Sequence, residues 1–573
     1  MRQCHLLFIL AVCISSWLAA STVAKAQPSK WSLTTSSYRD ADSGAGIVAM
    51  TADSSGNVFV LGYFRGTVWL GGHHLARPSG GGIFVAKRRP GEAGFAWVVQ
   101  GGGSYYDSPG HLAVVGSNVY VTGLFSHSSA EFGAARLANR GYELTGYSHS
   151  EYYVAKLCDE GQTGRFVWAR RAGSVGDEYD EGLAVRDHDV YIAGGFEGPA
   201  LDIGADTLRR VTKAYGADAF LAHLIDEGDS SRVIWVQPLS GARQVMVSEL
   251  AITPNGLYLV GHAGRLLSSE DRQVTDPYQV MGSFITKLTD TGHSPHPVWV
   301  KTLGQAYSQL SINQLAVQGH HLYVAGTAEQ LKVPAGSPLF VVGAVPRRPG
   351  GSTWHTSSYV ARLVDEGATA RLEWTHHLGK GFVRIEALAA DEAGVYVAGT
   401  FDSAALPLGD WLLVNAAQVP PDEFATSDAF IAYLANTGTA VSCTAAGRWG
   451  TVGYDEALAI ARHGQAVSIG GNLRTDGSGI GLRRAQILLA TGATSPSSPA
   501  VLRQATVVLP NNLVACPVLA IVRNALGQVV RQASVTGFAT ASLSVNLTGL
   551  PAGVYSWQVR VGDNSMVSRL IVE

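Results

Sequence analysis

A short strand pattern that ends in glycine recurs along the chain. Apolar residues at alternating positions lead to the closing glycine, and the pattern returns at intervals of 61 to 73 residues. The copies are NVFVLG (57–62), NVYVTG (118–123), DVYIAG (189–194), GLYLVG (256–261), HLYVAG (321–326), GVYVAG (394–399) and QAVSIG (465–470). Turn residues precede most copies, so each copy predicts a strand that is entered from a tight turn.

Three further strand patterns accompany each copy. An apolar segment of the IFVAK type follows the glycine, and a polar turn such as the DEG at 159–161 then leads to a strand marked by tryptophan. The tryptophans are Trp97, Trp168, Trp235, Trp299 and Trp374, and Cys443 takes this place in the sixth unit. A short strand such as HLAV (111–114) or ELAI (249–252) comes next. Four strands per unit predict the blade of a β-propeller.

The number of units predicts an all-β, seven-bladed propeller over residues 27–490. The seventh unit lacks a tryptophan strand of its own, and we expect a strand after Trp31 to complete it and close the ring. Each unit is longer than a blade of the WD-repeat type. We expect the surplus to form long loops on one face of the disc, at 67–75, 130–137, 201–208 and 406–414.

The combination of these segments resembles a known family. GNVFVLGYF (56–64), then IFVAK, then a turn and a tryptophan strand that ends in GGG (101–103) are similar to the seven-bladed β-propeller repeats of secreted bacterial proteins. The resemblance implies the fold, and it implies no single chemistry.

The N-terminal end of the sequence has the pattern of an export signal. Arg2, an apolar stretch at 6–20 and the small-x-small sequence at 24–26 predict a signal peptide over residues 1–26. No later apolar stretch is long enough to span a bilayer, so we expect no transmembrane segment after cleavage.

The last part of the chain is expected to be a separate module. A Ser/Pro/Thr-rich linker (491–503) precedes strand patterns within 504–573 that predict a small Ig-like β-sandwich. GLPAGVYSWQVRV (549–561) and SRLIVE (568–573) resemble the C-terminal sorting domain of the Bacteroidetes type IX secretion system. The resemblance implies export by that machinery, with the sorting signal at Gly549, Leu550, Gly553, Val554, Tyr555, Leu570 and Glu573. The alternative is an Ig-like module that stabilises the protein or binds a ligand.

Composition excludes several classes of function. Charged residues make up only 15% of the 573 residues and the formal charge is −3, so a nucleic-acid partner is not expected. Cys158, Cys443 and Cys516 remain after signal cleavage, without a disulfide framework or a CxxC pair for zinc. No HExxH, GxSxG, phosphate-loop or EF-hand motif occurs, which favours a protein without catalysis or cofactor.

Acidic side chains recur just before the innermost strand of the blades. They are Asp107, Asp180, Glu181, Glu249, Glu386, Asp455 and Glu456. We expect them either to be ordinary turn formers or to make a polar ring at one channel mouth, able to hold calcium or a hydroxyl-rich ligand. Basic residues in the second pattern, namely Lys87, Lys156, Lys287 and Arg362, are expected to be exposed strand charges.

These observations favour a secreted or cell-surface propeller that binds a glycan or a protein ligand. An extracellular polysaccharide hydrolase or lyase is one alternative, and it would need paired carboxylates at one mouth. A structural surface scaffold is the other.

Overall fold

The computed structural model describes most of the region between residues 44 and 474 and parts of the remainder. The described residues are 32–34, 37–38, 44–77, 80–92, 94–103, 107–145, 149–211, 216–239, 245–263, 282–303, 310–329, 356–378, 383–409, 411–416, 426–437, 441–450, 453–464, 466–474, 485–493, 504–508, 518–524, 528–535, 542–547, 550–551, 553–561 and 564–572. The expected signal peptide lies outside them. They form two compact units, a propeller within residues 28–494 and a C-terminal unit.

Six antiparallel blades of the propeller are each built from strands that follow one another along the chain. The first is β3 (Gly44–Ala52), β4 (Val58–Arg65), β7 (Gly81–Arg88) and β8 (Trp97–Gly101), and the second is β9 (Ser108–Val115), β10 (Asn118–Phe125), β13 (Glu151–Asp159) and β14 (Gly164–Gly173). The third is β15 (Glu178–Arg186), β16 (Asp189–Phe196), β19 (Asp218–Asp226) and β20 (Ser231–Pro238), and the fourth is β21 (Val245–Thr253), β22 (Gly256–Ala263), β23 (Gly282–Asp290) and β24 (Pro295–Leu303). The fifth is β25 (Gln314–Gln318), β26 (His321–Glu329), β27 (Thr356–Asp365) and β28 (Ala370–Leu378), and the sixth is β29 (Val383–Ala390), β30 (Gly394–Phe401), β33 (Asp428–Asn436) and β34 (Val441–Trp449).

One further sheet combines both ends of the propeller sequence. The strands β35 (Glu456–His463), β36 (Ala466–Arg474) and β37 (Ala485–Ala493) pair in order, and β1 (Ser32–Thr34) pairs antiparallel with β37. The six blades and this sheet differ because only the latter needs a strand from the other end of the chain.

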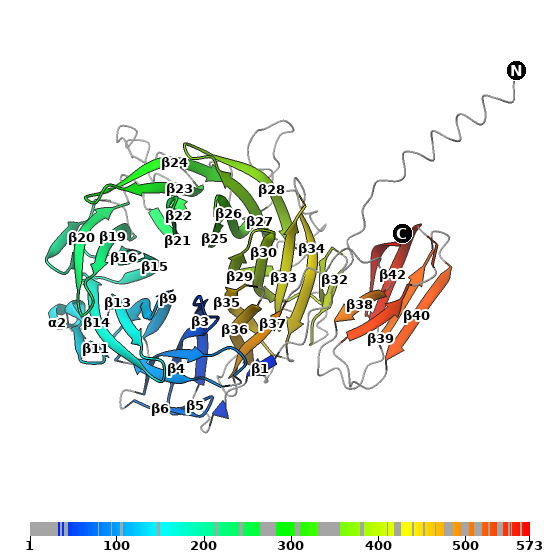
Figure 1. The fold of residues 1–573 in the computed structure, drawn as a ribbon, viewed down its shortest axis with the longest axis horizontal. Coiled ribbons are helices and arrows are strands. Elements are labelled where there is room, and N and C mark those ends of the chain that lie inside the picture. The colour runs from blue at the N-terminus through cyan, green and yellow to red at the C-terminus, as the bar shows by residue number, and fades with distance from the viewer. Residues whose placement is uncertain are drawn as a thin grey trace, which may run out of the picture. The chain divides into compact units, whose positions relative to one another are not determined.

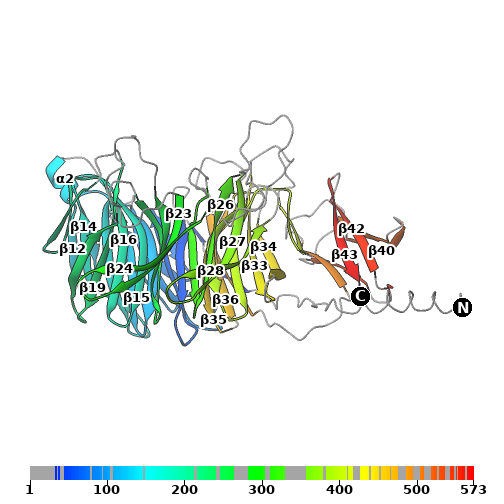
Figure 2. The same ribbon diagram turned by 90° about the horizontal axis from the view of Figure 1, so that it is seen from above.

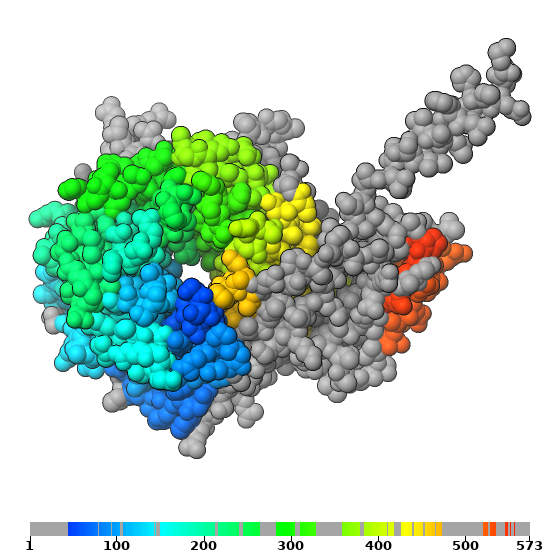
Figure 3. Space-filling view, in the orientation of Figure 1, coloured from blue at the N-terminus to red at the C-terminus, as the bar shows by residue number. Residues whose placement is uncertain are grey.

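The blades are arranged in a circle with the first strand of each on the inside (Figure 1). The inner strands lie next to one another in the order β3, β9, β15, β21, β25, β29 and β35, and β35 lies beside β3. Seen edge-on, the blade strands run across the thickness of the disc (Figure 2). The space-filling view shows an opening at the centre of the ring, between the inner strands (Figure 3).

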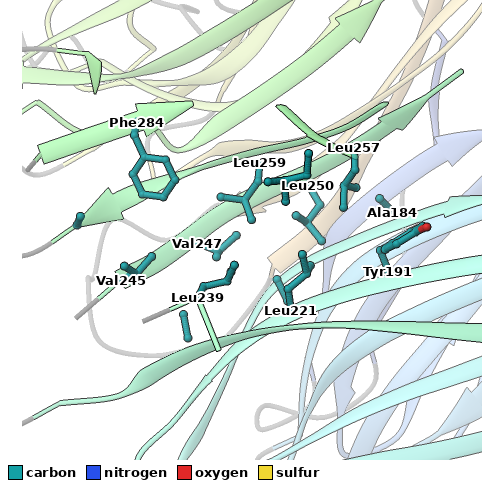
Figure 4. Close-up of a cluster of buried hydrophobic side chains, with 14 of the residues drawn as sticks. Ala184, Tyr191, Leu221, Leu239, Val245, Val247, Leu250, Leu257, Leu259 and Phe284 are labelled. Carbon is teal, nitrogen blue, oxygen red and sulfur yellow. The ribbon is translucent and has the colours of Figure 1, made fainter. Parts of the chain in front are cut away.

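Apolar side chains between neighbouring blades form the core. Between the third and fourth blades, Leu221 and Leu239 pack with Val247, Leu250 and other residues of the next sheet (Figure 4). Alternation along each strand places apolar side chains on both faces of a blade, which is why a single blade cannot bury its surface alone.

The segments expected to be long loops contain β-hairpins instead, which corrects that prediction. They are β5 (Val68–Leu70) with β6 (His73–Leu75), β11 (Ser129–Phe132) with β12 (Ala135–Ala138), β17 (Ala200–Ile203) with β18 (Asp206–Arg209), and β31 (Ala405–Leu408) with β32 (Trp411–Val414). β17 pairs with β14, the outermost strand of the preceding blade, and β5 pairs with β2 (Ser37–Tyr38). Hairpins that cover an outer strand protect its free hydrogen-bonding edge.

In three blades the third strand begins with a buried carboxylate. This carboxylate accepts a backbone N–H from the segment that leads back from the preceding hairpin. Asp428 accepts the backbone N–H of Ala416 after β32, and Asp218 accepts that of Val211 after β18. Glu151 accepts the N–H of Arg140, where the only helix among the described residues, α2 (Arg140–Thr145), begins. These acids are therefore structural.

Buried aspartates bind polar side chains of the preceding blade, and we call these contacts latches. Asp226, the last residue of β19, accepts hydrogen bonds from Lys156 Nζ at 2.6 Å, Trp168 Nε1 at 3.0 Å and Tyr120 Oη at 2.7 Å, all from the preceding blade. Asp365 is bound in the same way by Lys287, Trp299 and Tyr258. The other latch carboxylates are Asp159, bound by Lys87 and Trp97, and Asp290, bound by His223, Trp235 and Tyr191.

The latches correct the expectation that the recurring basic residues are exposed. Lys87, Lys156 and Lys287 are less than 10% exposed, and each pairs with a latch carboxylate. Arg362 is also buried, but it pairs with Glu373 of its own blade. Burial is tolerated because each charge meets an opposite charge and further hydrogen bonds.

The C-terminal unit is also built from strands. β40 (Val529–Val535), β39 (Val518–Arg523), β42 (Gly553–Val561) and β43 (Asn564–Val572) form one antiparallel sheet in that order. β38 (Gln504–Val508) pairs with β41 (Ser542–Asn546). All six strands lie within residues 504–573, where the sequence predicted strands.

Candidate functional site

The two ends of each blade carry different chemistry. Because the four strands are antiparallel, the start of the inner strand and the turn between the third and fourth strands lie at opposite ends of the blade. The latch carboxylates occupy the turns at one end. The acidic residues predicted as a ring lie at or just before the starts of the inner strands, at the other end, which we call the mouth end.

Four residues of the second and third blades meet at the mouth end. The Asp180 carboxylate accepts the Thr122 hydroxyl, with oxygen–oxygen distances of 3.1 and 2.9 Å, and lies 3.2 Å from His111 Nδ1. The Asp180 side chain is only 5% exposed. The fully buried Tyr152 is also near Asp180, and burial together with Asp180 raises the pKa of the Tyr152 hydroxyl.

Two glutamates extend this group toward the fourth blade. The pairing between β15 and β16 shifts between Asp180 and Gly182, so Glu181 is the extra residue of a β-bulge. A bulge redirects a side chain out of the regular alternation, and Glu181 accepts the backbone N–H of Val247 on β21 at 2.9 Å. Glu249 follows on β21 and interacts electrostatically with His111. We call His111, Thr122, Asp180, Glu181 and Glu249 the mouth cluster.

Burial controls the protonation of the mouth cluster. It raises the pKa of Glu181 to about 8 and that of Glu249 to about 7, and Asp180 adds to both effects while His111 opposes them. Burial disfavours the charge of His111, but Asp180, Glu249 and Glu181 outweigh it and raise the His111 pKa to about 9. At neutral pH the cluster therefore combines an imidazolium with carboxyl groups that can donate or accept a hydrogen bond.

Two large side chains are exposed at the ends of the same strands. Tyr179 is 41% exposed at the start of β15, and Met246 is 52% exposed at the start of β21. Each stands three residues or fewer from a glutamate of the mouth cluster. The Tyr179 hydroxyl donates to Glu197 at 2.6 Å, which fixes the ring in place. An exposed aromatic beside polar groups is a common element of a ligand-binding surface.

The other predicted acidic residues lie apart from the mouth cluster. Glu386 and Glu456 share one arginine, and Asp107 and Asp455 are structural. Arg384 Nε lies 3.5 Å from a Glu386 oxygen and a second Arg384 nitrogen lies 3.5 Å from Glu456, on the sixth blade and the sheet after it. Asp107 is buried and accepts the N–H groups of Gly103 and Ser126. Asp455 is fully buried, and its N–H donates to the Ser427 carbonyl. Thus the predicted ring is divided rather than continuous.

The structure adds His111, which the sequence interpretation missed. His111 and Glu249 occupy the same position of the inner-strand pattern, before LAV and LAI respectively. Aligning the repeats at that position would have singled out His111. Within the described part of the chain, no group of three or more His, Cys, Asp or Glu residues is arranged to hold a metal ion. A calcium site at the mouth end stays a prediction.

The C-terminal unit contains most of the predicted sorting residues. Gly553, Val554 and Tyr555 are in β42, and Tyr555 pairs across the sheet with Leu570 of β43. The Tyr555 hydroxyl donates to the Pro551 carbonyl at 2.7 Å, and the Leu550 N–H donates to Leu547. Gly549 and Glu573 lie outside the described residues.

Comparison with known proteins identifies one part of the chain. Residues 506–573 match the family described as the secretion system C-terminal sorting domain. No curated protein matches the chain. Among solved structures, that of apo AztD from Citrobacter koseri matches with 10% identity over 73% of this chain and 98% of its own length, at a TM-score of 0.29.

The sorting-domain match establishes where the protein works. Within the described residues there is no helix long and apolar enough to cross a membrane. The C-terminal region is similar to the type IX sorting domain that directs export. The chain thus joins a β-propeller to a C-terminal sorting domain, and it is a secreted or cell-surface protein.

Proposed function

We propose that this protein is a non-catalytic binding propeller of the cell surface or the extracellular medium. Its ligand, a glycan or a protein, sits over the mouth end of the second, third and fourth blades. The proposal rests on the mouth cluster together with the exposed Tyr179 and Met246, which belong to the strands β15 and β21 of the same cluster. Perturbed carboxyl groups beside an exposed aromatic are more typical of a binding surface than of structural pairs.

The opposite end of the blades supports this assignment by contrast. The latch carboxylates there have their hydrogen bonds filled by lysine, tryptophan and tyrosine side chains, so they have no capacity left for a ligand. Glu181 and Glu249 are only partly buried and keep oxygen atoms for further hydrogen bonds.

The proposal includes two finer points of architecture. The sheet of β35, β36, β37 and β1 acts as a seventh blade, which the short N-terminal strand completes. The C-terminal unit is an Ig-like sandwich in which the pair β38 and β41 faces the four-stranded sheet. Support for the first point comes from β35 lying beside both β29 and β3.

Binding is tested with the mature protein on arrays of extracellular glycans and on arrays of extracellular proteins. A ligand that binds the folded state raises the unfolding temperature in a concentration-dependent way. We expect the substitution Tyr179→Ala to reduce both the array signal and the thermal shift at least tenfold.

The matched control for this experiment is Glu366→Gln. Glu366 forms an exposed ion pair with Arg371 at the blade end that holds the latch carboxylates, which we call the latch end, so loss of this pair should leave binding unchanged. Equal binding by Tyr179→Ala and the wild type would remove the mouth end from consideration. Turnover of a polysaccharide by the wild type would favour the hydrolase or lyase alternative.

Processing is tested by the intact mass and the cell fraction of the native protein. We expect a surface or medium form that begins near Gln27 and lacks the C-terminal unit. A periplasmic form that retains residues 504–573 would contradict this and would make the C-terminal unit part of the working protein.

A further inference from the structure

The latch between the third and fourth blades differs from the other aspartate latches in the cation that it uses. Three of those latches hold a lysine, namely Lys87, Lys156 and Lys287. In the third blade His223 takes this place, at the end of AFLAH, as Lys156 does at the end of YYVAK. The ordinary pKa of histidine is about 6.5 and that of lysine about 10.4, so this junction alone among the four contains a type of cation that changes charge near neutral pH.

The third blade also has an additional acid beside its latch. Asp189 begins β16, and its Oδ1 lies 2.9 Å from His223 Nε2. The matching residues of the three lysine-bearing blades carry no charge: they are Asn57, Asn118 and Gly256. Asp290 Oδ2, from the fourth blade, lies 2.8 Å from His223 Nδ1. Each ring nitrogen of His223 therefore faces a carboxylate oxygen.

Aromatic side chains hold the imidazole ring in a buried position. The His223 side chain is only 6% exposed. It is stacked on Tyr191, with ring centroids 4.4 Å apart and an angle of 13° between the planes, and the Trp235 ring lies 5.7 Å away at 66°. Tyr191 Oη and Trp235 Nε1 also donate hydrogen bonds to Asp290. Water has little access to this ring, so solvent does not replace its contacts with the two carboxylates.

The two contacts are satisfied together only when the imidazole is charged. A neutral imidazole has one N–H group, and its other nitrogen carries a lone pair. Whichever nitrogen of His223 kept the hydrogen, the other would direct its lone pair toward a carboxylate oxygen. Nδ1 has no aligned hydrogen-bond partner among the described residues, so its short distance to Asp290 is an ion pair rather than a hydrogen bond. An ion pair requires the imidazolium form.

We propose that the junction between the third and fourth blades is a proton-dependent latch. Protonated His223 holds Asp189 of its own blade and Asp290 of the next blade. Loss of the proton removes this attraction and places a lone pair against a carboxylate, so the junction loosens as the pH rises. Latches that are built on lysine have no such step near neutral pH. The proposal does not depend on what the mouth end binds.

The charged and titratable groups that face His223 come from β16 and β23. They are Asp189 and Tyr191 from β16 and Asp290 from β23, while β20 supplies the uncharged indole of Trp235. Burial and Asp290 raise the pKa of Tyr191, so its hydroxyl keeps its hydrogen across the neutral range. Because folding favours the charged imidazole, the stability that the latch contributes is present at lower pH and is lost as the pH rises.

The experiment is hydrogen–deuterium exchange of the full mature protein, followed by mass spectrometry between about pH 6 and about pH 9. The exchange rate of the β23 amides that precede Asp290 is divided by that of the β13 amides that precede Asp159, whose latch uses Lys87. Both rates come from one sample, so the intrinsic effect of pH on exchange cancels. We expect the ratio to rise about fivefold or more, because one proton permits up to about tenfold per pH unit.

Variants assign the change to the latch. His223→Lys gives this junction the cation of the other three, and the ratio should then stay constant within about twofold. His296→Lys replaces an exposed histidine of β24 in the fourth blade and should keep the pH dependence of the wild type. Glu181 also joins these two blades through the Val247 N–H, and it is the same in both variants, so it cannot cause a difference between them.

Each outcome decides for or against the proposal. A rise in the wild type and in His296→Lys that is absent from His223→Lys supports it. A constant ratio in the wild type overturns it, and this result needs no substituted protein. A rise of the same size in His223→Lys also overturns it. If His223→Lys does not fold, Asp189→Asn takes its place, and there the rise should be at least about twofold smaller, since one of the two acids is gone; an unchanged rise contradicts the proposal.

Discussion

Carboxylates at the two ends of the blades differ in protonation although both sets are buried to a large extent. At the latch end, burial alone would raise the pKa of Asp226, but hydrogen bonds from Lys156, Tyr120 and Trp168 outweigh it and lower the pKa. At the mouth end, burial prevails and raises the pKa of Glu181 to about 8. The partners of a buried acid, more than its burial, therefore distinguish a structural charge from a candidate functional one.

The latches also differ around the ring. Four junctions use an aspartate, whereas the fifth uses Asn436, which accepts Trp374 Nε1 at 3.3 Å. In the sixth blade the buried Cys443 replaces the tryptophan, and Tyr433 donates to Asp391 of its own blade. The junctions before the closing sheet therefore depend more on apolar packing.

The largest effect is expected from breaking a complete latch. Asp226→Asn leaves the buried Lys156 without its counter-charge, and loss of one member of a buried pair costs about 3–5 kcal/mol. The free energy of unfolding of the mature protein, measured by urea denaturation, checks this. The neighbouring Glu227→Gln, which breaks only an exposed pair with Arg232, should cost about 0–1 kcal/mol. Similar losses in the two variants would show that the latch is not a stabilising contact.

A smaller difference in the free energy of unfolding is expected between the loss of a charged latch and the loss of the neutral latch at Asn436. Trp299→Phe removes a hydrogen bond to the buried Asp365 carboxylate, and bonds to charged groups contribute about 1.5–3 kcal/mol. Trp374→Phe removes a longer bond to a neutral amide, for which about 0.5–1.5 kcal/mol is expected. Both changes remove similar apolar area, so the difference between them reports the charge. A larger loss of stability in Trp374→Phe than in Trp299→Phe would show that the charged latch is not the stronger of the two.

The smallest expected effect is a slope of stability with pH that the mouth cluster causes. The folded pKa values of Glu181 and Glu249 lie above the unfolded value, so the folded state binds more protons between about pH 4.5 and pH 8. Raising the pH through this window therefore favours unfolding, and His111 acts in the same direction between about 6.5 and 9. The latch aspartates act in the opposite sense, since their lowered pKa values lose stability only as the pH falls into the acid range.

Unfolding temperatures across this window test the slope. The double substitution Glu181→Gln and Glu249→Gln should flatten it by an amount on the order of 1–2 kcal/mol per pH unit. Glu160→Gln, which affects an exposed ion pair with Arg165, should not change it. An unchanged slope in the double variant would mean that the two glutamates are already ionised in the folded protein.

Sequence patterns predicted the blade strands well because those patterns are local. The closing glycines fall inside the second strand of each described blade, as with Gly123 in β10 and Gly261 in β22. The strand expected after Trp31 corresponds to β1. Segments such as 201–208 were misread as loops because short strands take their structure from the edge they join, which here is β14 of another blade.

The candidate site was predicted only in part, because contacts between blades are invisible in the local sequence. Asp180, Glu181 and Glu249 each act electrostatically on His111, whereas Asp107 and Asp455 bind backbone groups. A binding role for the predicted ring stays a prediction. Lys156 was misjudged for the same reason, since its partner Asp226 lies 70 residues further along the chain.

The repeated strand order, the all-β class and the C-terminal sorting region follow from the sequence alone. These depend on side-chain alternation, turn residues and a contiguous motif, all of which act over a few neighbouring positions. Which carboxyl groups have buried partners, and which remain open at the mouth end, depends on how neighbouring blades pack. The physical reason is that charge and protonation depend on groups brought near in space, and in a propeller those groups come from the next blade.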